Sequence, residues 1–280
     1  MGDGEMKNDE MKDSEIKGSE RKGRNTGEPV KRLLIWGAGD QGIVTLDCAL
    51  AMNRYSRIDF MELKEKGHRA IPEYLIRRED DGLDQVLKSY DEVIVATGSN
   101  ELREKKISML VSLGIPLAVI IHPTAVISPL SRIAKGCTIH PYAVINAYAS
   151  IGTGCIINTQ ADIEHDCVVE DFVNVCPKVS MAGHTVVGRK TFLGIGCTII
   201  DGIRIGTEAT VGAGAVVIRD VPDHAAVAGV PAKDIREIQV PAAGAVFLCM
   251  ENWKRSFRAA SPPRRTTGWS FPRRFLGFPC

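Results

Sequence analysis

The sequence lacks several features that would point to particular partners or compartments. Its 35 basic and 34 acidic residues nearly cancel, leaving a formal net charge of +1, so the overall charge gives no electrostatic argument for nucleic-acid binding. No apolar run approaches the roughly 18–20 residues that a membrane-spanning helix needs. The polar first residues also lack the apolar core of a signal peptide. We therefore expect a cytoplasmic protein with no membrane span.

A repeat of six residues organises the middle of the chain. Every sixth position from Ile121 to Val217 is aliphatic, without a slip or an insertion. This period fits a parallel β-helix, in which one short strand and one turn take six residues and three such units make a coil. Each aliphatic residue, here called a rung, should point inward and stack on rungs of neighbouring coils. We expect about five to six coils, ending at Pro222. The rungs are Ile121, Ile127, Ile133, Ile139, Ile145, Ile151, Ile157, Ile163, Val169, Val175, Met181, Val187, Leu193, Ile199, Ile205, Val211 and Val217.

The cysteines fit this repeat better than they fit a metal site or disulfides. None of the eight occurs in a Cys-x-x-Cys pair, the spacing typical of cysteine metal sites. Cys137, Cys155, Cys167 and Cys197 all follow a rung by four residues, where alanine is otherwise common. Cysteine there acts as a small apolar residue at a tight corner. We expect reduced, structural thiols, in agreement with a cytoplasmic setting.

Residues 31–120 read as a small α/β unit. Buried strands are predicted at 33–36, at 58–61 and at 92–96, and a helical pattern follows the first of them. After the last strand, Asn100 is placed to cap a helix from 101 to 113. The unit is followed directly by the six-residue repeat.

A glycine-rich loop, residues 37–42, lies between the first strand and its helix, as a phosphate-binding turn does. Glu62 lies twenty residues beyond Gly42, where a ribose-binding acid is expected, so the loop taken alone predicts NAD. However, the unit has only about 90 residues, too few for a two-halved dinucleotide domain. No second domain for hydride chemistry follows. A structural turn that binds nothing stays open as an alternative.

The two ends of the chain differ from the rest. Residues 1–30 alternate acidic and basic side chains with almost nothing apolar, which predicts a disordered tail. Residues 237–280 interleave basic and aromatic side chains. That composition is compatible with a membrane-surface or nucleic-acid segment, but no helical or strand period supports it. We expect an irregular tail.

Two motifs carry a resemblance to a known family. Residues 163–168 (IEHDCV) and 228–233 (AGVPAK) resemble hexapeptide-repeat acyltransferases with a left-handed β-helix. More narrowly, residues 31–236 are similar to sugar-nucleotide N-acetyltransferases of the bacillosamine and perosamine type, with sialic acid O-acetyltransferases as relatives. The resemblance implies an N-terminal Rossmann-like domain over 31–120 that binds a sugar nucleotide. An all-β left-handed β-helix acyltransferase domain over 121–236 would follow it.

The resemblance implies an acetyl-CoA-dependent N-acetyltransferase. Its acceptor would be the amine of a UDP- or GDP-linked amino sugar, of the 4-amino-4,6-dideoxy type, used in surface glycan biosynthesis. The sugar nucleotide would contact Gly39, Asp40 and Gln41 of the glycine loop, together with Glu62 and Gly98. The family often has paired aspartates after the second strand, whereas Glu62 is followed here by leucine. The nucleotide preference therefore stays open.

His165 is the predicted general base. An imidazole titrates near neutral pH and can take the proton of an attacking amine. It follows the Ile163 rung by two residues, where side chains leave the coil. By the family resemblance, Asp166 orients the ring and raises its basicity. The alternative without a catalytic role is a surface histidine beside a surface aspartate.

The same resemblance suggests where acetyl-CoA binds. Bacillosamine-type relatives have a second histidine nine residues after the base, and Asn174 takes that position here. Asparagine donates hydrogen bonds but is not a base, so His165 would act alone. Ile195 and Ala213 are predicted in the acetyl-CoA wall, and Lys233 is placed to reach a CoA phosphate or to remain solvated.

Other functions remain open at this point. The same base acting on a hydroxyl would make a sialic acid or sugar O-acetyltransferase. A trimer that has lost turnover would be a binding or scaffold protein, and the resemblance implies a homotrimer in each case. His184 lies about one coil after His165, a spacing similar to that in zinc carbonic anhydrases of this architecture. Those enzymes need three converging histidines, and the phase of His140 differs, so we expect no metal.

Overall fold

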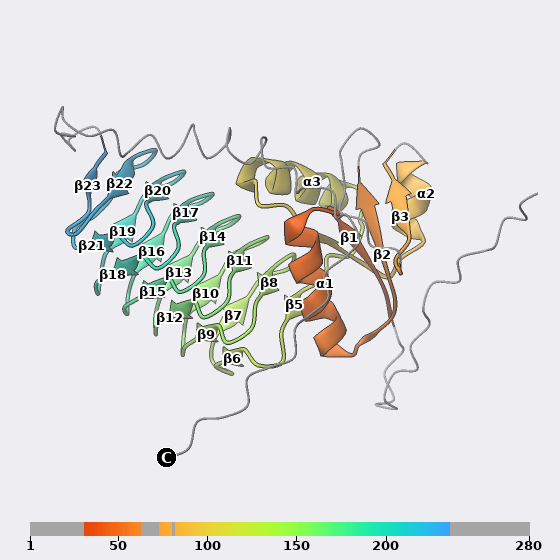
Figure 1. Ribbon diagram of the computed structural model, residues 1–280, viewed down its shortest axis with the longest axis horizontal. Helices are drawn as coiled ribbons and strands as arrows, with labels where there is room; N and C mark the ends of the chain where they lie inside the picture. Colours follow the sequence, from red (N-terminus) through yellow and green to blue (C-terminus); the bar gives the residue numbers. More distant parts are fainter. Residues whose placement is uncertain (1–30, 63–72, 80–81, 236–280) are drawn as a thin grey trace, which may run out of the picture. The chain divides into compact units, whose positions relative to one another are not determined.

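The computed structural model describes residues 31–62, 73–79 and 82–235, which all belong to one compact unit. Both predicted tails lie outside the described residues. Figure 1 shows an α/β part that leads into a ladder of short parallel strands. Among the helices the structure describes, none is long and apolar enough to cross a membrane.

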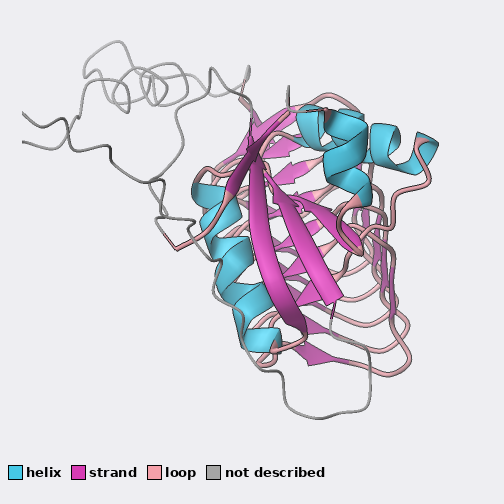
Figure 2. Ribbon diagram, turned by 90° about the vertical axis from the view of Figure 1, so that its right-hand side faces the viewer, coloured by secondary structure: helices cyan, strands magenta, loops and turns pink. Residues whose placement is uncertain are grey.

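The α/β part is a four-stranded parallel sheet with the order β3-β2-β1-β4. Its strands are β1 (Lys31–Trp36), β2 (Tyr55–Glu62), β3 (Ile76–Arg78) and β4 (Glu92–Val95). Alternate residues of β1 face opposite sides of the sheet, and both sides are buried. Figure 2 shows why: helix α1 (Asp40–Met52) covers one face, while α2 (Leu83–Lys88) and α3 (Asn100–Ser112) cover the other.

Two details of this part differ from the sequence-based expectation. The cap of α3 is Ser99, whose Oγ accepts a hydrogen bond from the Leu102 backbone N–H at 3.2 Å, so the prediction that Asn100 caps the helix was wrong. Asn100 is the first helical residue, and its amide instead donates to the Lys190 carbonyl at 2.7 Å. Strand β3 and helix α2 were not anticipated, because both are short and only partly buried.

The repeat forms a parallel β-helix in which every strand from β5 to β21 has two residues, the second being the rung. From β5 to β18, each strand pairs with the strand 18 residues on, as Ile145 does with Ile163, and the strands form three sheets. The bounds are β5 Ile120–Ile121, β6 Val126–Ile127, β7 Arg132–Ile133, β8 Thr138–Ile139, β9 Val144–Ile145, β10 Ser150–Ile151, β11 Ile156–Ile157, β12 Asp162–Ile163, β13 Val168–Val169, β14 Asn174–Val175, β15 Ser180–Met181, β16 Val186–Val187, β17 Phe192–Leu193, β18 Thr198–Ile199, β19 Arg204–Ile205, β20 Thr210–Val211 and β21 Val216–Val217.

The rungs build one continuous core. All rungs from Ile139 onward are buried, and the first three are partly buried where the ladder begins. The small corner residues are buried beside them, including the four cysteines predicted there. All described cysteines are free thiols. Burial raises the pKa of the Cys167 thiol to about 11, which keeps it protonated and unreactive at neutral pH.

The β-helix continues past the predicted end at Pro222. Strand β22 (Ala226–Ala228) pairs in parallel with β20, with Val227 opposite Val211. Val221 likewise bridges Ile205. In each of these two pairs the residues are 16 positions apart rather than 18, so the six-residue step misses this last coil. Strand β23 (Lys233–Asp234) then turns back antiparallel on β22 and ends the described ladder.

A buried arginine joins the α/β part to the β-helix. Arg103 of α3 is fully buried, and its guanidinium donates to the carbonyls of Gly154 (2.6 Å) and Phe172 (2.7 Å) at two β-helix corners. It also donates to the Thr97 carbonyl at 3.0 Å and to Asn100 Oδ1 at 2.7 Å. Burial lowers the pKa of Arg103 to about 10, still charged at neutral pH. The hydrogen bonds offset the cost of burying that charge.

Candidate active site

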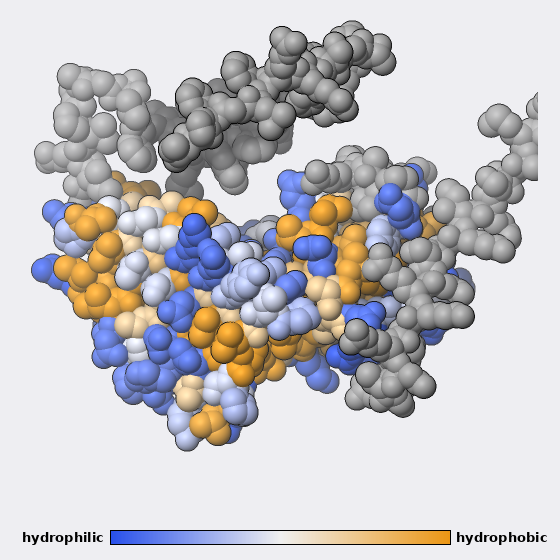
Figure 3. Space-filling view, turned by 60° about the horizontal axis from the view of Figure 1, so that its bottom comes forward, coloured by the Kyte–Doolittle hydropathy of each residue, from blue (hydrophilic) through white to orange (hydrophobic). Residues whose placement is uncertain are grey.

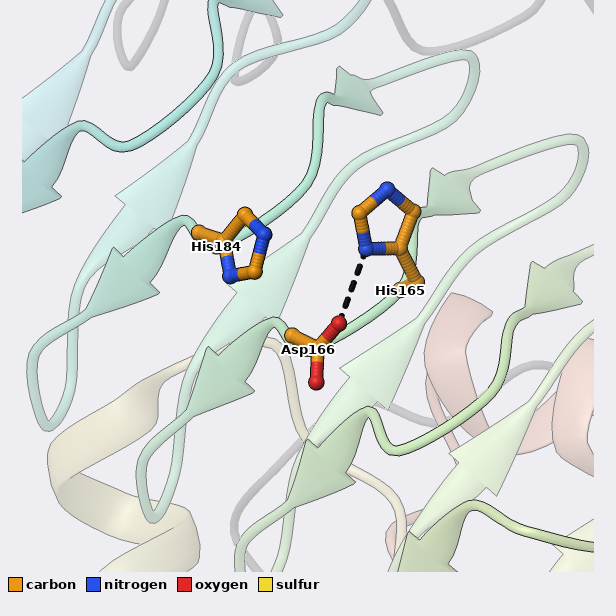
Figure 4. Close-up of side chains that lie close together, drawn as sticks. All are labelled: His165, Asp166 and His184. Carbon is orange, nitrogen blue, oxygen red and sulfur yellow. Dashed lines mark hydrogen bonds and ion pairs between the residues drawn. The ribbon is translucent and has the colours of Figure 1, made fainter.

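His165 and Asp166 occupy the turn between β12 and β13, at the corner where the six-stranded sheet meets the five-stranded sheet. Asp166 adopts a left-handed backbone conformation, with φ of 58°, which an aspartate tolerates better than most residues. The turn leaves both side chains exposed. His165 Nδ1 lies 2.9 Å from Asp166 Oδ2 (Figure 4), so the predicted pair is in contact.

The charges around His165 favour its protonated form. The hydrogen bond to Asp166 raises the pKa of His165 above its ordinary value, and the charges of Asp166, Glu164 and Asp201 add to that effect. In the neutral ring, the hydrogen on Nδ1 faces Asp166 and the lone pair lies on Nε2. A raised pKa makes that nitrogen a stronger proton acceptor than a free imidazole.

The next coil holds the His165 ring in place. Gly183 follows His165 by one 18-residue coil, and a Cβ built on it would lie 2.6 Å from His165 Cε1 and 2.8 Å from Nε2. The ring therefore lies over a position that has room only because it is glycine. His184 closes the other side, with its ring edge-to-face to that of His165 at a centroid distance of 5.1 Å. Its backbone N–H donates to the His165 carbonyl at 3.1 Å.

The residues predicted for acetyl-CoA lie elsewhere on the same chain. Asn174 is on β14 in the eight-stranded sheet, and Lys233 is on β23 at the end of that sheet. Ile195 and Ala213 are exposed at the corner between the eight- and six-stranded sheets. In a three-sided β-helix, the corner that carries His165 is opposite the eight-stranded sheet. One chain therefore does not bring His165 together with these four residues.

Asn174 is oriented by its neighbour one coil back along the same sheet. Asn158 Nδ2 donates to the Asn174 Oδ1 at 3.2 Å and to the Val175 carbonyl at 2.9 Å. The carbonyl side of the Asn174 amide is thus turned toward Asn158, and its NH₂ group is the part able to donate to a ligand. This agrees with a donor role for Asn174, although the residue is buried within the chain.

The glycine loop and the segment after β4 meet at the carboxyl edge of the sheet. A Cβ on Gly37 would lie 2.3 Å from the Ala96 carbonyl, so the two segments can touch only through glycine. Gly39 and Asp40 are exposed at the start of α1. Gln41 reaches toward the β-helix, where its Nε2 lies 3.4 Å from His140 Nε2.

Glu62 lies beneath this loop rather than on its outer side. Its side chain is buried, and its Oε2 accepts a hydrogen bond from the Ala38 backbone N–H at 3.0 Å. The carboxylate therefore supports the conformation of the glycine loop, which the sequence spacing did not indicate.

Gly98 lines a cavity of about 300 Å³ between the start of α3 and the β-helix. Ser99 and Asn100 line it from the α/β part, and Phe192 and Thr210 from strands β17 and β20. Sequence reasoning missed Phe192 and Thr210. The signal was present, because each directly precedes a rung and must therefore point out of the coil.

Comparison with known proteins identifies the family of the chain. The family model of the PglD N-terminal domain matches residues 32–110. A histidine-to-asparagine variant of perosamine N-acetyltransferase from Caulobacter crescentus, solved with CoA and GDP-perosamine, is 33% identical with a TM-score of 0.69. The match covers 72% of this chain and 96% of that one. The chain belongs to the hexapeptide-repeat sugar acetyltransferases.

A second solved member of this family is also close. The acetyltransferase domain of PglB from Neisseria gonorrhoeae, in complex with acetyl coenzyme A, is 31% identical with a TM-score of 0.68, over 74% of this chain and 100% of that one. The predicted family and the predicted fold class, an α/β unit followed by a left-handed β-helix, are therefore confirmed. At the level of the family, so are the acyltransferase class and acetyl-CoA as co-substrate.

Matches to curated enzymes are shorter. A tetrahydropyridine-dicarboxylate N-acetyltransferase from Enterococcus faecalis is 44% identical over 57 residues, which is 20% of this chain and 24% of that enzyme. The chain thus matches only about a quarter of that relative's length, within the acetyltransferase class.

Proposed function

We propose that this sugar acetyltransferase transfers the acetyl group of acetyl-CoA to the amine of a nucleotide-linked amino sugar. The acceptor is a UDP- or GDP-linked sugar of the 4-amino-4,6-dideoxy type, used in surface glycan biosynthesis. The observation that carries the proposal is the His165–Asp166 pair, in contact at 2.9 Å on an exposed corner of the β-helix. The GDP-perosamine bound by the Caulobacter relative supports the acceptor class.

His165 acts as the general base. Its Nε2 takes the proton from the sugar amine as the nitrogen attacks the thioester carbonyl, and Asp166 keeps the Nδ1 hydrogen in place while the ring becomes positive. The carbon–sulfur bond then breaks, and the proton that His165 took from the amine is passed to the departing sulfur, so CoA leaves as a thiol. A hydrogen bond from the Asn174 amide to the thioester oxygen would stabilise the charge that develops there.

The acceptor is held by the α/β part. Gly39, Asp40 and Gln41 present exposed or half-exposed groups at the start of α1, where backbone N–H groups and the helix dipole favour a diphosphate. Glu62 holds the loop from below. Gly98 opens the cavity beside it for the sugar.

A homotrimer would complete the site. Within one chain, His165 is on the corner opposite the sheet that carries Asn174. Packing the His165 corner of one chain against the eight-stranded sheet of a second chain would bring the base to Asn174 and the acceptor cavity. Ile195, Ala213 and Lys233 would then line the acetyl-CoA side of the same cleft.

The test measures CoA released from acetyl-CoA by the wild type and by His165→Ala. The acceptors are UDP- and GDP-linked 4-amino sugars, with sialic acid as the hydroxyl acceptor. We expect turnover on one amino-sugar nucleotide and a loss of kcat of about a hundredfold to ten-thousandfold in the variant, the usual contribution of a general base.

The matched control is His224→Ala, which removes another exposed corner histidine beside a carboxylate, Glu208, at 3.3 Å. It should keep wild-type activity. Turnover on sialic acid alone would replace the proposal with O-acetylation. Acetyl-CoA binding by calorimetry without turnover on any acceptor would favour a non-catalytic binding or scaffold protein.

A further inference from the structure

The corner that carries His165 gathers more metal-binding groups than a general base requires. His165, Asp166 and His184 each offer a ligand atom, and these atoms all lie within 4.8 Å of one another (Figure 4). The three come from two successive coils, so the ladder itself sets their spacing. Two imidazoles and a carboxylate are a donor set suited to Zn²⁺ and related divalent transition metals.

Two further carboxylates surround this cluster. Glu164 and Asp201 both act on the charge of His165, and Asp201 Oδ1 lies 3.1 Å from where a Gly183 Cβ would be. Glu164, Asp166 and Asp201 thus place three carboxylates near the His165 ring. Carboxylates beside a metal site favour a dication and can orient its ligands.

We infer that this corner is an inhibitory site for a divalent transition-metal ion of the zinc class, held by His165, Asp166 and His184. Zinc–nitrogen and zinc–oxygen bonds are about 2.0–2.2 Å, so ligands up to 4.8 Å apart need only small side-chain rotations to meet one ion. All three side chains are exposed. Metal binding at the site does not depend on the proposed function; its inhibitory effect does.

Inhibition follows from the chemistry of the imidazole. A neutral ring has one nitrogen with a hydrogen and one with a lone pair. When the lone pair binds a metal, the other nitrogen carries the hydrogen, so the ring has no place for a proton from the acceptor amine. This holds whether the ion binds Nδ1 or Nε2 of His165. An ion at this corner therefore removes the base.

The binding test uses the full chain, freed of metal by dialysis against a chelator and titrated with Zn²⁺ by calorimetry. Co²⁺ absorption reports whether histidine nitrogens are ligands. His184→Asn removes one imidazole while keeping a residue that tolerates the left-handed backbone at this position, φ 56°. We expect Zn²⁺ binding to the wild type and at least about a hundredfold weaker binding to the variant.

The matched control is His224→Asn, at a second exposed corner histidine with φ 57°, and it should bind Zn²⁺ as the wild type does. Equal Zn²⁺ affinity in His184→Asn and the wild type, or no binding to the wild type, would overturn the site. Loss of binding in both variants would place the ion elsewhere and overturn it equally.

The inhibition test adds Zn²⁺ to the acetyl-transfer assay, with CoA quantified by chromatography because zinc binds thiols. Wild type should be inhibited over the concentration range in which it binds Zn²⁺, and chelator should restore its activity. Measured against its own metal-free rate, His184→Asn should lose little activity at the same Zn²⁺ concentration. Equal inhibition of both proteins would reject the inhibitory role. If the wild type turns over no acceptor, the proposed function fails, and calorimetry still decides the metal site by itself.

Discussion

In the β-helix, the position of a side chain follows from its place in an 18-residue coil, whereas in the α/β part it depends on contacts between residues far apart in the sequence. His165, Gly183 and Asp201 stack at one corner because each is one coil from the next. By contrast, the glycine loop is supported by Glu62, and α1 meets the β-helix through Gln41 and His140.

The two parts therefore differ in what they provide structurally. A repeated coil builds a stiff surface on which a base can be placed in register with groups above and below it. Figure 3 shows apolar patches interleaved with polar ones on one face of the molecule. Exposed apolar side chains at β-helix corners and strands include Leu130, Tyr148 and Ile200, and they would suit the packing of a further chain in the proposed trimer.

The largest expected loss of stability comes from a substitution at the junction between the α/β part and the β-helix. Arg103→Met keeps the length of the side chain but removes four hydrogen bonds, leaving the buried carbonyls of Gly154 and Phe172 without their donor. We expect the free energy of unfolding to fall by about 3–5 kcal/mol, measured by urea denaturation. Arg132→Met, an exposed arginine on β7, is the control and should change stability little. Similar small losses in both variants would show that the junction does not depend on Arg103.

A second effect at the junction depends on pH. His140 is almost fully buried between Gln41 and Cys48, and burial lowers its pKa from 6.5 to about 4. The unfolded chain therefore binds a proton that the folded protein does not between these pH values. Stability is complete above pH 6.5 and falls as the pH drops toward 4, by about 3 kcal/mol for this group.

The measurement compares urea unfolding of the wild type and His140→Gln across this pH range. The variant should lose less stability on acidification, because its side chain does not titrate. His224→Gln, at an exposed histidine, should retain the wild-type slope. An unchanged slope in His140→Gln would contradict the assignment.

A smaller effect, on kcat/KM, is expected from a substitution one coil after His165. Gly183→Ala places a methyl group against the His165 ring, at 2.6 Å from Cε1, and so must turn the ring away. The equivalent positions one and two coils earlier are His165 and Ala147, so the corner itself accepts a Cβ. We expect kcat/KM to fall about ten- to hundredfold through misplacement of the base, with Tm nearly unchanged. Full activity in this variant would mean that the orientation of the ring over Gly183 is not needed.

The smallest expected effect concerns the start of α3. Ser99→Ala removes the hydrogen bond to the Leu102 N–H and should lower the free energy of unfolding by about 1 kcal/mol. Ser108→Ala, at an exposed position inside the same helix, should be close to neutral. Equal effects of the two substitutions in urea denaturation would argue against Ser99 as the cap.

The sequence predicted most of the β-helix, because a constant period places every residue relative to its neighbours. The pair His165–Asp166 was predicted from the resemblance of residues 163–168 to the family motif. The β-helix prediction failed where the period changes. The last coil pairs Val227 with Val211 over 16 residues, which a six-residue step cannot find. In the α/β part, the sequence located the main strands but assigned the α3 cap to Asn100. The Asn100 amide instead donates a hydrogen bond to the Lys190 carbonyl of the β-helix.

The sequence by itself determined the repeat, the corner that carries His165 and the existence of a glycine loop before a helix. Each of these follows from local spacing. Only the tertiary structure decided that Glu62 turns inward beneath the loop and that Arg103 joins the two parts. Both facts depend on which buried hydrogen-bond partners a side chain meets after folding, and spacing along the chain does not encode that.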